Sequence, residues 1–148
     1  MRTTNDLMNE LTHEVTDERS LNEYLERIDK YSGVSFADYF KLLMDRHKVS
    51  KSDVIKNSLI ERTFASKMLS KSENAKRPTR NHLIALCISC NCSVAETEKC
   101  LSLSGNSAFY SKDSRDSIII YGINRGLSVM EINELLFEKG HELLVTQK

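Results

Sequence analysis

Residues 51–71 have the sequence KSDVIKNSLIERTFASKMLSK, and this stretch decides the fold. Its apolar residues recur at the three- and four-residue spacing of two short amphipathic helices that share a core. The members of this apolar set are Val54, Ile55, Ile60, Phe64, Ala65, Met68 and Leu69. The pattern predicts a helix over residues 51–58, a tight turn at residues 59–60 and a second helix over residues 61–71, which together make a helix-turn-helix.

The second predicted helix directs polar and basic side chains away from this core. They are Arg62, Thr63, Ser66, Lys67 and Lys71. Such side chains suit contacts with phosphates and base edges, and an α-helix fits the major groove of DNA. The sequence therefore predicts a recognition helix over about residues 61–71, with double-stranded DNA as its partner.

Basic residues are concentrated around the same stretch. The whole chain holds 21 basic and 21 acidic side chains, so net charge alone predicts no polyanionic partner. Residues 46–80, however, contain ten bases against three acids, a net charge of +7, whereas residues 1–34 have a net charge of −4. A local positive patch is typical of nucleic-acid-binding surfaces. Since helical proteins also expose lysines without function, the charge favours DNA binding but does not establish it.

The rest of the chain also has the pattern of helices. It has 148 residues with one proline, five glycines and no tryptophan, and it lacks runs of alternating apolar and polar residues. A serine followed three residues later by an acid is a signature of a helix start. This signature occurs at Ser35, Ser50, Ser93 and Ser128. We therefore predict an all-α protein.

The chain divides into three predicted parts. Residues 1–34 form an acidic N-terminal helical segment, residues 35–105 the helix-turn-helix domain, and residues 106–148 a C-terminal helical hairpin ended by glycines. Within the hairpin, residues 114–125 are nearly apolar all round, as in a helix that is buried or lies at a subunit contact. No signal peptide is visible, and no apolar run is long enough to span a membrane. We expect a soluble cytoplasmic protein with no membrane partner.

Residues 35–105 resemble the five-helix DNA-binding domain of lambda-repressor-like (Cro/cI, or XRE) transcription factors. The residues that make this resemblance are 50–58, Arg62, Thr63, and the continuation from Pro78 to Leu86. Residues 114–136 also resemble a C-terminal extension of one bacterial branch of such proteins. The resemblance implies a sequence-specific DNA-binding transcriptional regulator that reads two half-sites as a homodimer.

The resemblance also assigns DNA contacts along the motif. Lys51, at the start of the first motif helix, would touch a phosphate. Arg62 and Thr63 would face base edges, and one turn later Ser66 and Lys67 would reach a base or the adjacent backbone. Phosphate contacts beyond the recognition helix would be made by Lys71, Lys76 and Arg77.

Two residues of the motif depart from the family pattern. The turn usually contains glycine because one residue needs a positive φ, but this chain has Leu59. Leucine at positive φ is strained, so we expect a rebuilt turn or a changed angle between the helices. Glu61 stands at the cap of the recognition helix, where we expect a weak cap and a charge that repels phosphate. These departures lead to a second hypothesis, a protein-binding adaptor or antitoxin-like module whose partner binds the N-terminal segment or the C-terminal helices.

The four cysteines offer a further alternative. Cys87 and Cys90 have the spacing of a metal-ligand pair, and Cys92 and Cys100 would complete a four-thiolate zinc site. Core packing is the favoured interpretation, because most of these residues fall on apolar helix faces and buried free cysteine acts as a small hydrophobe. The histidines have no partner at ligand spacing, and residues 113–116 are interpreted as a helix cap with a local ion pair. The sequence contains no catalytic pattern, so we predict no enzyme, no metal site and no cofactor.

Overall fold

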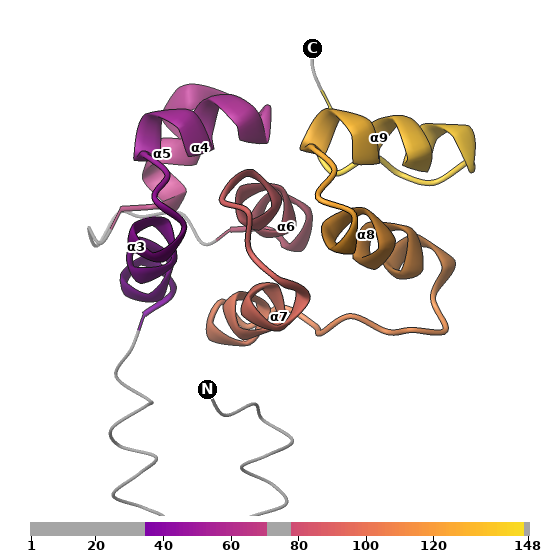
Figure 1. Ribbon diagram of the computed structural model, residues 1–148, viewed down its shortest axis with the longest axis horizontal. Coiled ribbons are helices and arrows are strands. Elements are labelled where there is room, and N and C mark those ends of the chain that lie inside the picture. The colour runs from indigo at the N-terminus through magenta and orange to yellow at the C-terminus, as the bar shows by residue number, and fades with distance from the viewer. Residues whose placement is uncertain (1–34, 71–77, 147–148) are drawn as a thin grey trace, which may run out of the picture. The chain divides into compact units, whose positions relative to one another are not determined.

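Seven α-helices form the described part of the computed structural model, which comprises residues 35–70 and 78–146 (Figure 1). They are α3 (Phe36–His47), α4 (Lys51–Ser58), α5 (Arg62–Met68), α6 (Arg80–Ser89), α7 (Val94–Leu103), α8 (Ser114–Asn124) and α9 (Val129–Glu138). None of the described residues belongs to a strand, so the predicted all-α class is confirmed for them. No described helix is both long enough and apolar enough to span a bilayer. The predicted helical segment at residues 1–34 lies outside the described residues.

The predicted helix starts are confirmed. The side chains of Ser50, Ser93 and Ser128 each accept a hydrogen bond from the backbone N–H three residues later. At the last two sites the glutamate at that later position bonds back to the serine N–H and completes a capping box. The fourth predicted start is also correct, because α3 begins directly after Ser35.

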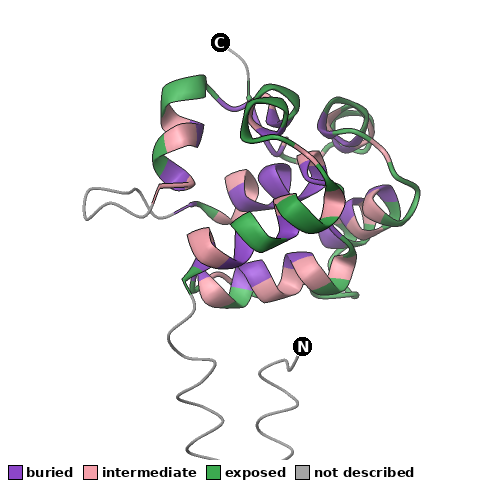
Figure 2. Ribbon diagram, turned by 60° about the vertical axis from the view of Figure 1, so that its left-hand side comes forward, coloured by how far each residue is buried: buried purple, intermediate pink, exposed green. Residues whose placement is uncertain are grey.

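The core is built around α6, which lies between α4 and α5 on one side and α8 on the other (Figure 1). Residues 83–88 of α6 are all buried, as expected for a helix that is surrounded by others. Helices α4, α7 and α9 pack against α6, and α3 packs against α7. Figure 2 shows the buried residues facing one another between the helices, with the exposed residues on the outer faces.

Helices α8 and α9 form the predicted C-terminal pair. They pack closely, because a Cβ added at Gly122 would lie only 2.5 Å from Cγ1 of Ile132. After α9 the chain folds back on it, since Asn133 donates to the carbonyl of Val145 at 3.0 Å and accepts from the backbone N–H of Leu144 at 2.8 Å. The nearly apolar α8 is buried on only part of its circumference, and Tyr121 remains 53% exposed.

An ion pair attaches this helical pair to α6. The two terminal nitrogens of Arg80 each donate to one carboxylate oxygen of Asp116 at 2.9 Å. Asp113 accepts from the backbone N–H of Asp116 at 2.9 Å and so caps α8. The predicted cap at residues 113–116 is therefore confirmed. The predicted local ion pair is wrong for Asp116, because its partner lies 36 residues away in the sequence.

All four cysteines are buried free thiols, as the core-packing interpretation requires. Cys87, Cys90 and Cys100 are fully buried, and Cys92 is only 4% exposed. The sulfur of Cys92 lies within hydrogen-bonding reach of the thiols of Cys87 and Cys90. The four side chains thus fill space between α6 and α7 and also contact one another.

Candidate nucleic-acid interface

A short ordered turn joins α4 to α5. Ser58 is fully buried, and its hydroxyl donates to the carbonyl of Ile55 at 2.7 Å and accepts from the backbone N–H of Ile60 at 3.2 Å. Leu59 adopts φ +65° and ψ +5°, in the left-handed region. Leucine therefore takes the positive φ that glycine usually provides here, and the expected strain is located at this residue.

Leu59→Gly is expected to be more stable than Leu59→Ala by about 1 kcal/mol. Both variants lose the leucine side chain, but only glycine removes the strain of the left-handed backbone. Equilibrium unfolding in urea measures the difference. The matched control is the exposed helical residue Lys56, where the glycine variant should be less stable than the alanine variant by about 1 kcal/mol. Finding the same order of stability at both positions would show that Leu59 is unstrained.

The packing of α5 fixes which of its side chains face outward. Ala65 and Met68 are buried, with exposed fractions of 0% and 2%. The ring of Phe64 contacts that of His82 on α6 edge to face, with the centroids 5.4 Å apart. Of the predicted shared core, Val54, Ile60, Ala65 and Met68 are buried, and the other three members are half-buried. The opposite face of α5 is thereby directed to solvent.

Glu61 caps the start of α5. Its carboxylate accepts from the backbone N–H of Thr63 at 3.0 Å and of Phe64 at 2.8 Å. These two bonds hold the pKa of Glu61 below its ordinary value of 4.5. The expectation of a weak cap is wrong, because the longer side chain reaches both amides with one oxygen each. The expected negative charge is present, directly before Arg62.

Exposed basic side chains line a depression between α4 and α5. Its lining residues are Lys51, Ser52, Ile55, Lys56, Leu59, Ile60, Arg62 and Ser66. Lys51, Lys56 and Arg62 are exposed, and no carboxylate among the described residues forms an ion pair with them. Their positive charges are therefore available to an anionic ligand.

The depression brings together three of the residues predicted from the sequence, namely Lys51, Arg62 and Ser66. It also includes Lys56, which the prediction omitted. The spacing contained a signal for it, since Lys56 lies four residues, about one helical turn, after Ser52 and is exposed like it.

The other predicted contacts have different outcomes. Thr63 is exposed, but its backbone N–H donates to Glu61. Lys67 is exposed on α5. The helix ends at Met68, so the predicted extension to residue 71 is wrong for residues 69 and 70. The predicted phosphate contacts Lys71, Lys76 and Arg77 lie outside the described residues.

Among the described residues of the positive segment at residues 46–80, two bases form ion pairs with carboxylates of the same chain. Arg46 pairs with Glu96 at 2.7 Å, and Arg80 pairs with Asp116. Burial raises the pKa of Glu96, but hydrogen bonds from Ser93, His47 and Arg46 outweigh it, so that this pKa lies below its ordinary value. Glu96 thus stays ionised and holds Arg46, and the sequence count of +7 overstates the charge available to a ligand.

Comparisons with known proteins do not add to this picture. No protein-family model, no curated protein and no solved structure matches the chain. The functional assignment therefore depends on the residues and geometry described above.

Proposed function

We propose that this protein is a sequence-specific DNA-binding transcriptional regulator that places α5 in the major groove. The observation that supports this most is the set of exposed cations Lys51, Lys56 and Arg62 around one depression between α4 and α5. An α-helix fits the major groove, and cations on the elements beside it neutralise phosphates. The resemblance of residues 35–105 to lambda-repressor-like domains favours the same function.

The exposed residues suggest a division of roles. Arg62, at the start of α5, suits bidentate hydrogen bonding to guanine, whereas Lys51 and Lys56 on α4 suit phosphates as point charges. Lys67 lies on the outer face of α5 and suits the backbone beside the groove. A homodimer would present two such surfaces to two half-sites about one helical turn of DNA apart.

A second candidate function is a protein-binding adaptor or antitoxin-like module. It is favoured by large exposed apolar side chains on α9, where Met130 is 56% and Phe137 is 78% exposed. These residues are seven apart and therefore lie on one face of the helix. Grouped apolar side chains of this kind often mark a protein contact.

Selection from a pool of random duplexes distinguishes the two functions. The full-length protein is expected to enrich one sequence, and fluorescence anisotropy should then give tighter binding to that duplex than to a scrambled one. Phe137→Ser, on the α9 face, should retain this preference. Failure of the wild type to enrich any sequence would favour the adaptor function. Loss of DNA binding in Phe137→Ser with an unchanged circular dichroism spectrum would instead show that the α9 face contributes to DNA binding.

Glu61→Gln is expected to bind DNA more tightly than the wild type, by roughly twofold to tenfold at low salt. Glutamine can still accept a hydrogen bond at the start of α5, but the negative charge next to Arg62 is removed. Anisotropy titrations measure the change, and the gain should shrink as salt is added. Asp53→Asn is the control, because it removes the same single negative charge from an exposed residue in the first turn of α4. Its gain in affinity should be smaller than that of Glu61→Gln. Unchanged affinity in Glu61→Gln would indicate that the start of α5 does not face DNA.

A further inference from the structure

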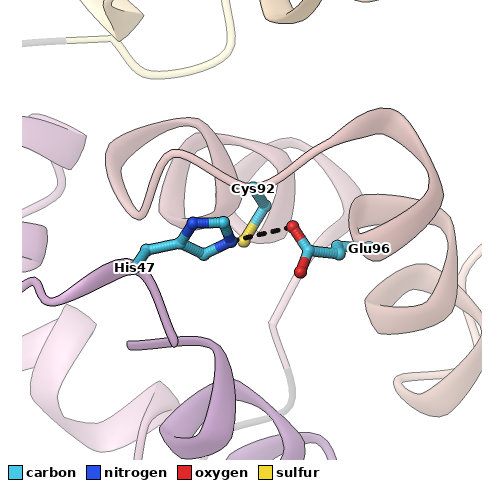
Figure 3. Close-up of side chains that lie close together, drawn as sticks. All are labelled: His47, Cys92 and Glu96. Atoms are coloured by element: carbon cyan, nitrogen blue, oxygen red, sulfur yellow. Dashed lines mark hydrogen bonds and ion pairs between the residues drawn. The ribbon is translucent and has the colours of Figure 1, made fainter. Parts of the chain in front are cut away.

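Three different metal-binding side chains meet beside α7. His47 is the last residue of α3, Cys92 lies in the loop between α6 and α7, and Glu96 lies in the first turn of α7. Figure 3 shows the imidazole approaching from one side while the sulfur and the carboxylate face it from the other. An imidazole nitrogen, the cysteine sulfur and a carboxylate oxygen all lie within 4.8 Å of one another.

These separations suit a tetrahedral metal ion. Bond lengths to zinc of about 2.0–2.1 Å from nitrogen and oxygen and about 2.3 Å from sulfur place tetrahedral ligands roughly 3.3–3.6 Å apart. Nε2 of His47 and Oε1 of Glu96 are 2.8 Å apart in a hydrogen bond, so they would separate slightly to admit an ion. The sulfur lies within the same 4.8 Å limit, so the required side-chain movements are small.

We propose that His47, Cys92 and Glu96 bind a divalent metal ion of the zinc class. A thiolate with an imidazole and a carboxylate is a mixed donor set that zinc and cobalt accept and that magnesium or calcium does not favour. The ion takes the place of the proton between His47 and Glu96, which moves to Nδ1 as the neutral imidazole binds through Nε2, and the Cys92 proton leaves to solvent when the metal–sulfur bond forms. This site is independent of the proposed DNA binding.

The surroundings of the three residues suit this role. The thiols of Cys87 and Cys90 lie within hydrogen-bonding reach of the sulfur of Cys92, and outer groups of this kind can orient a ligand. The side chains of His47 and Glu96 are 25% and 13% exposed, so one side of the site is open to solvent. An incoming ion can therefore reach the three donors without unfolding the core, and water can occupy a remaining position on the metal.

Metal binding has a structural consequence for the fold. His47 and Glu96 are 49 residues apart in the sequence, so one ion links the end of α3 to the start of α7. A ligand that binds the folded state but not the unfolded state raises the unfolding temperature. Because His47 is the last residue before the turn that joins α3 to α4, the ion would also fix the start of this turn.

Cobalt binding by the reduced full-length protein tests the site. The protein is first treated with a reductant and a chelator, and both are then removed. Co²⁺ is expected to bind at one ion per chain and to give a thiolate-to-cobalt charge-transfer absorption. Zn²⁺ should displace it and raise the unfolding temperature. His47→Gln and Cys92→Ser should weaken binding by more than roughly 100-fold. Glu96→Gln should also weaken it while keeping the cap of α7, since glutamine serves in a capping box.

Cys100→Ser is the matched control, because Cys100 is a buried thiol outside the three-residue group. It should change metal affinity far less than Cys92→Ser does, with circular dichroism confirming that each variant is folded. Absence of thiolate absorption with Co²⁺ in the wild type would overturn the proposal. So would affinity that depends on Cys100 and not on His47, which would indicate a site made by cysteines alone.

Discussion

Replacing Asp116 by alanine is expected to lower the free energy of unfolding by about 3–5 kcal/mol. The variant leaves the guanidinium of Arg80, whose side chain is only 23% exposed, without its carboxylate. It also leaves the backbone N–H of Tyr110 without its acceptor at 3.0 Å. Since small domains are stable by only about 5–15 kcal/mol, the loss should be evident in urea unfolding at neutral pH.

The pH dependence provides an internal check on this ion pair. Burial raises the pKa of Asp116, but the hydrogen bonds from Arg80 and Tyr110 outweigh it and bring the pKa below its ordinary value of 3.8. The stabilisation is therefore complete above about pH 4 and is lost as the pH falls through the lowered pKa. The difference in the free energy of unfolding between the wild type and Asp116→Ala should therefore become smaller in acid. Asp113→Ala, which removes only the cap of α8, should cost about 1 kcal/mol; an equal cost for both variants would contradict a special role of the ion pair.

Arg62→Ala is expected to weaken binding to the enriched duplex by about 1–3 kcal/mol and to relax sequence preference. A bidentate contact to one base discriminates among bases, and alanine cannot replace it. Lys51→Ala should instead weaken binding to all sequences alike. It should also reduce the slope of the logarithm of affinity against the logarithm of salt concentration by about one. Anisotropy with the enriched and scrambled duplexes measures both variants. If Arg62→Ala weakened binding to both duplexes equally, Arg62 would not take part in base recognition.

Much of the local structure could be predicted because its causes lie within a few residues. A serine with an acid three positions later was sufficient to locate the starts of α4, α7 and α9. The need for a positive φ between α4 and α5 was implied by the resemblance to lambda-repressor-like domains, and Leu59 meets it despite its side chain. The cap at Glu61 was misjudged, because cap preferences describe short side chains and do not consider the reach of a longer one in this particular backbone.

The contacts that depend on tertiary structure could not be predicted. Arg80 was counted with the DNA-facing charge, yet its partner Asp116 becomes a neighbour only when α8 packs against the central helices. His47 had no partner at ligand spacing, and the fold brings it to Cys92 and Glu96. Sequence spacing reveals ligands that share one helix or loop, but it cannot show groups that meet across three elements.

DNA binding is tested most directly by a salt titration of the full-length protein with the enriched and scrambled duplexes. The logarithm of affinity should fall linearly with the logarithm of salt concentration, with a slope of about −3 or steeper per protomer, because the predicted contacts of Lys71, Lys76 and Arg77 add to three phosphate contacts from the described residues. Lys51, Lys56 and Lys67 are the described side chains expected to make them. The enriched duplex should remain the tighter ligand at every salt concentration. Binding that does not respond to salt, or equal binding of both duplexes at low salt, would contradict a sequence-specific DNA-binding function.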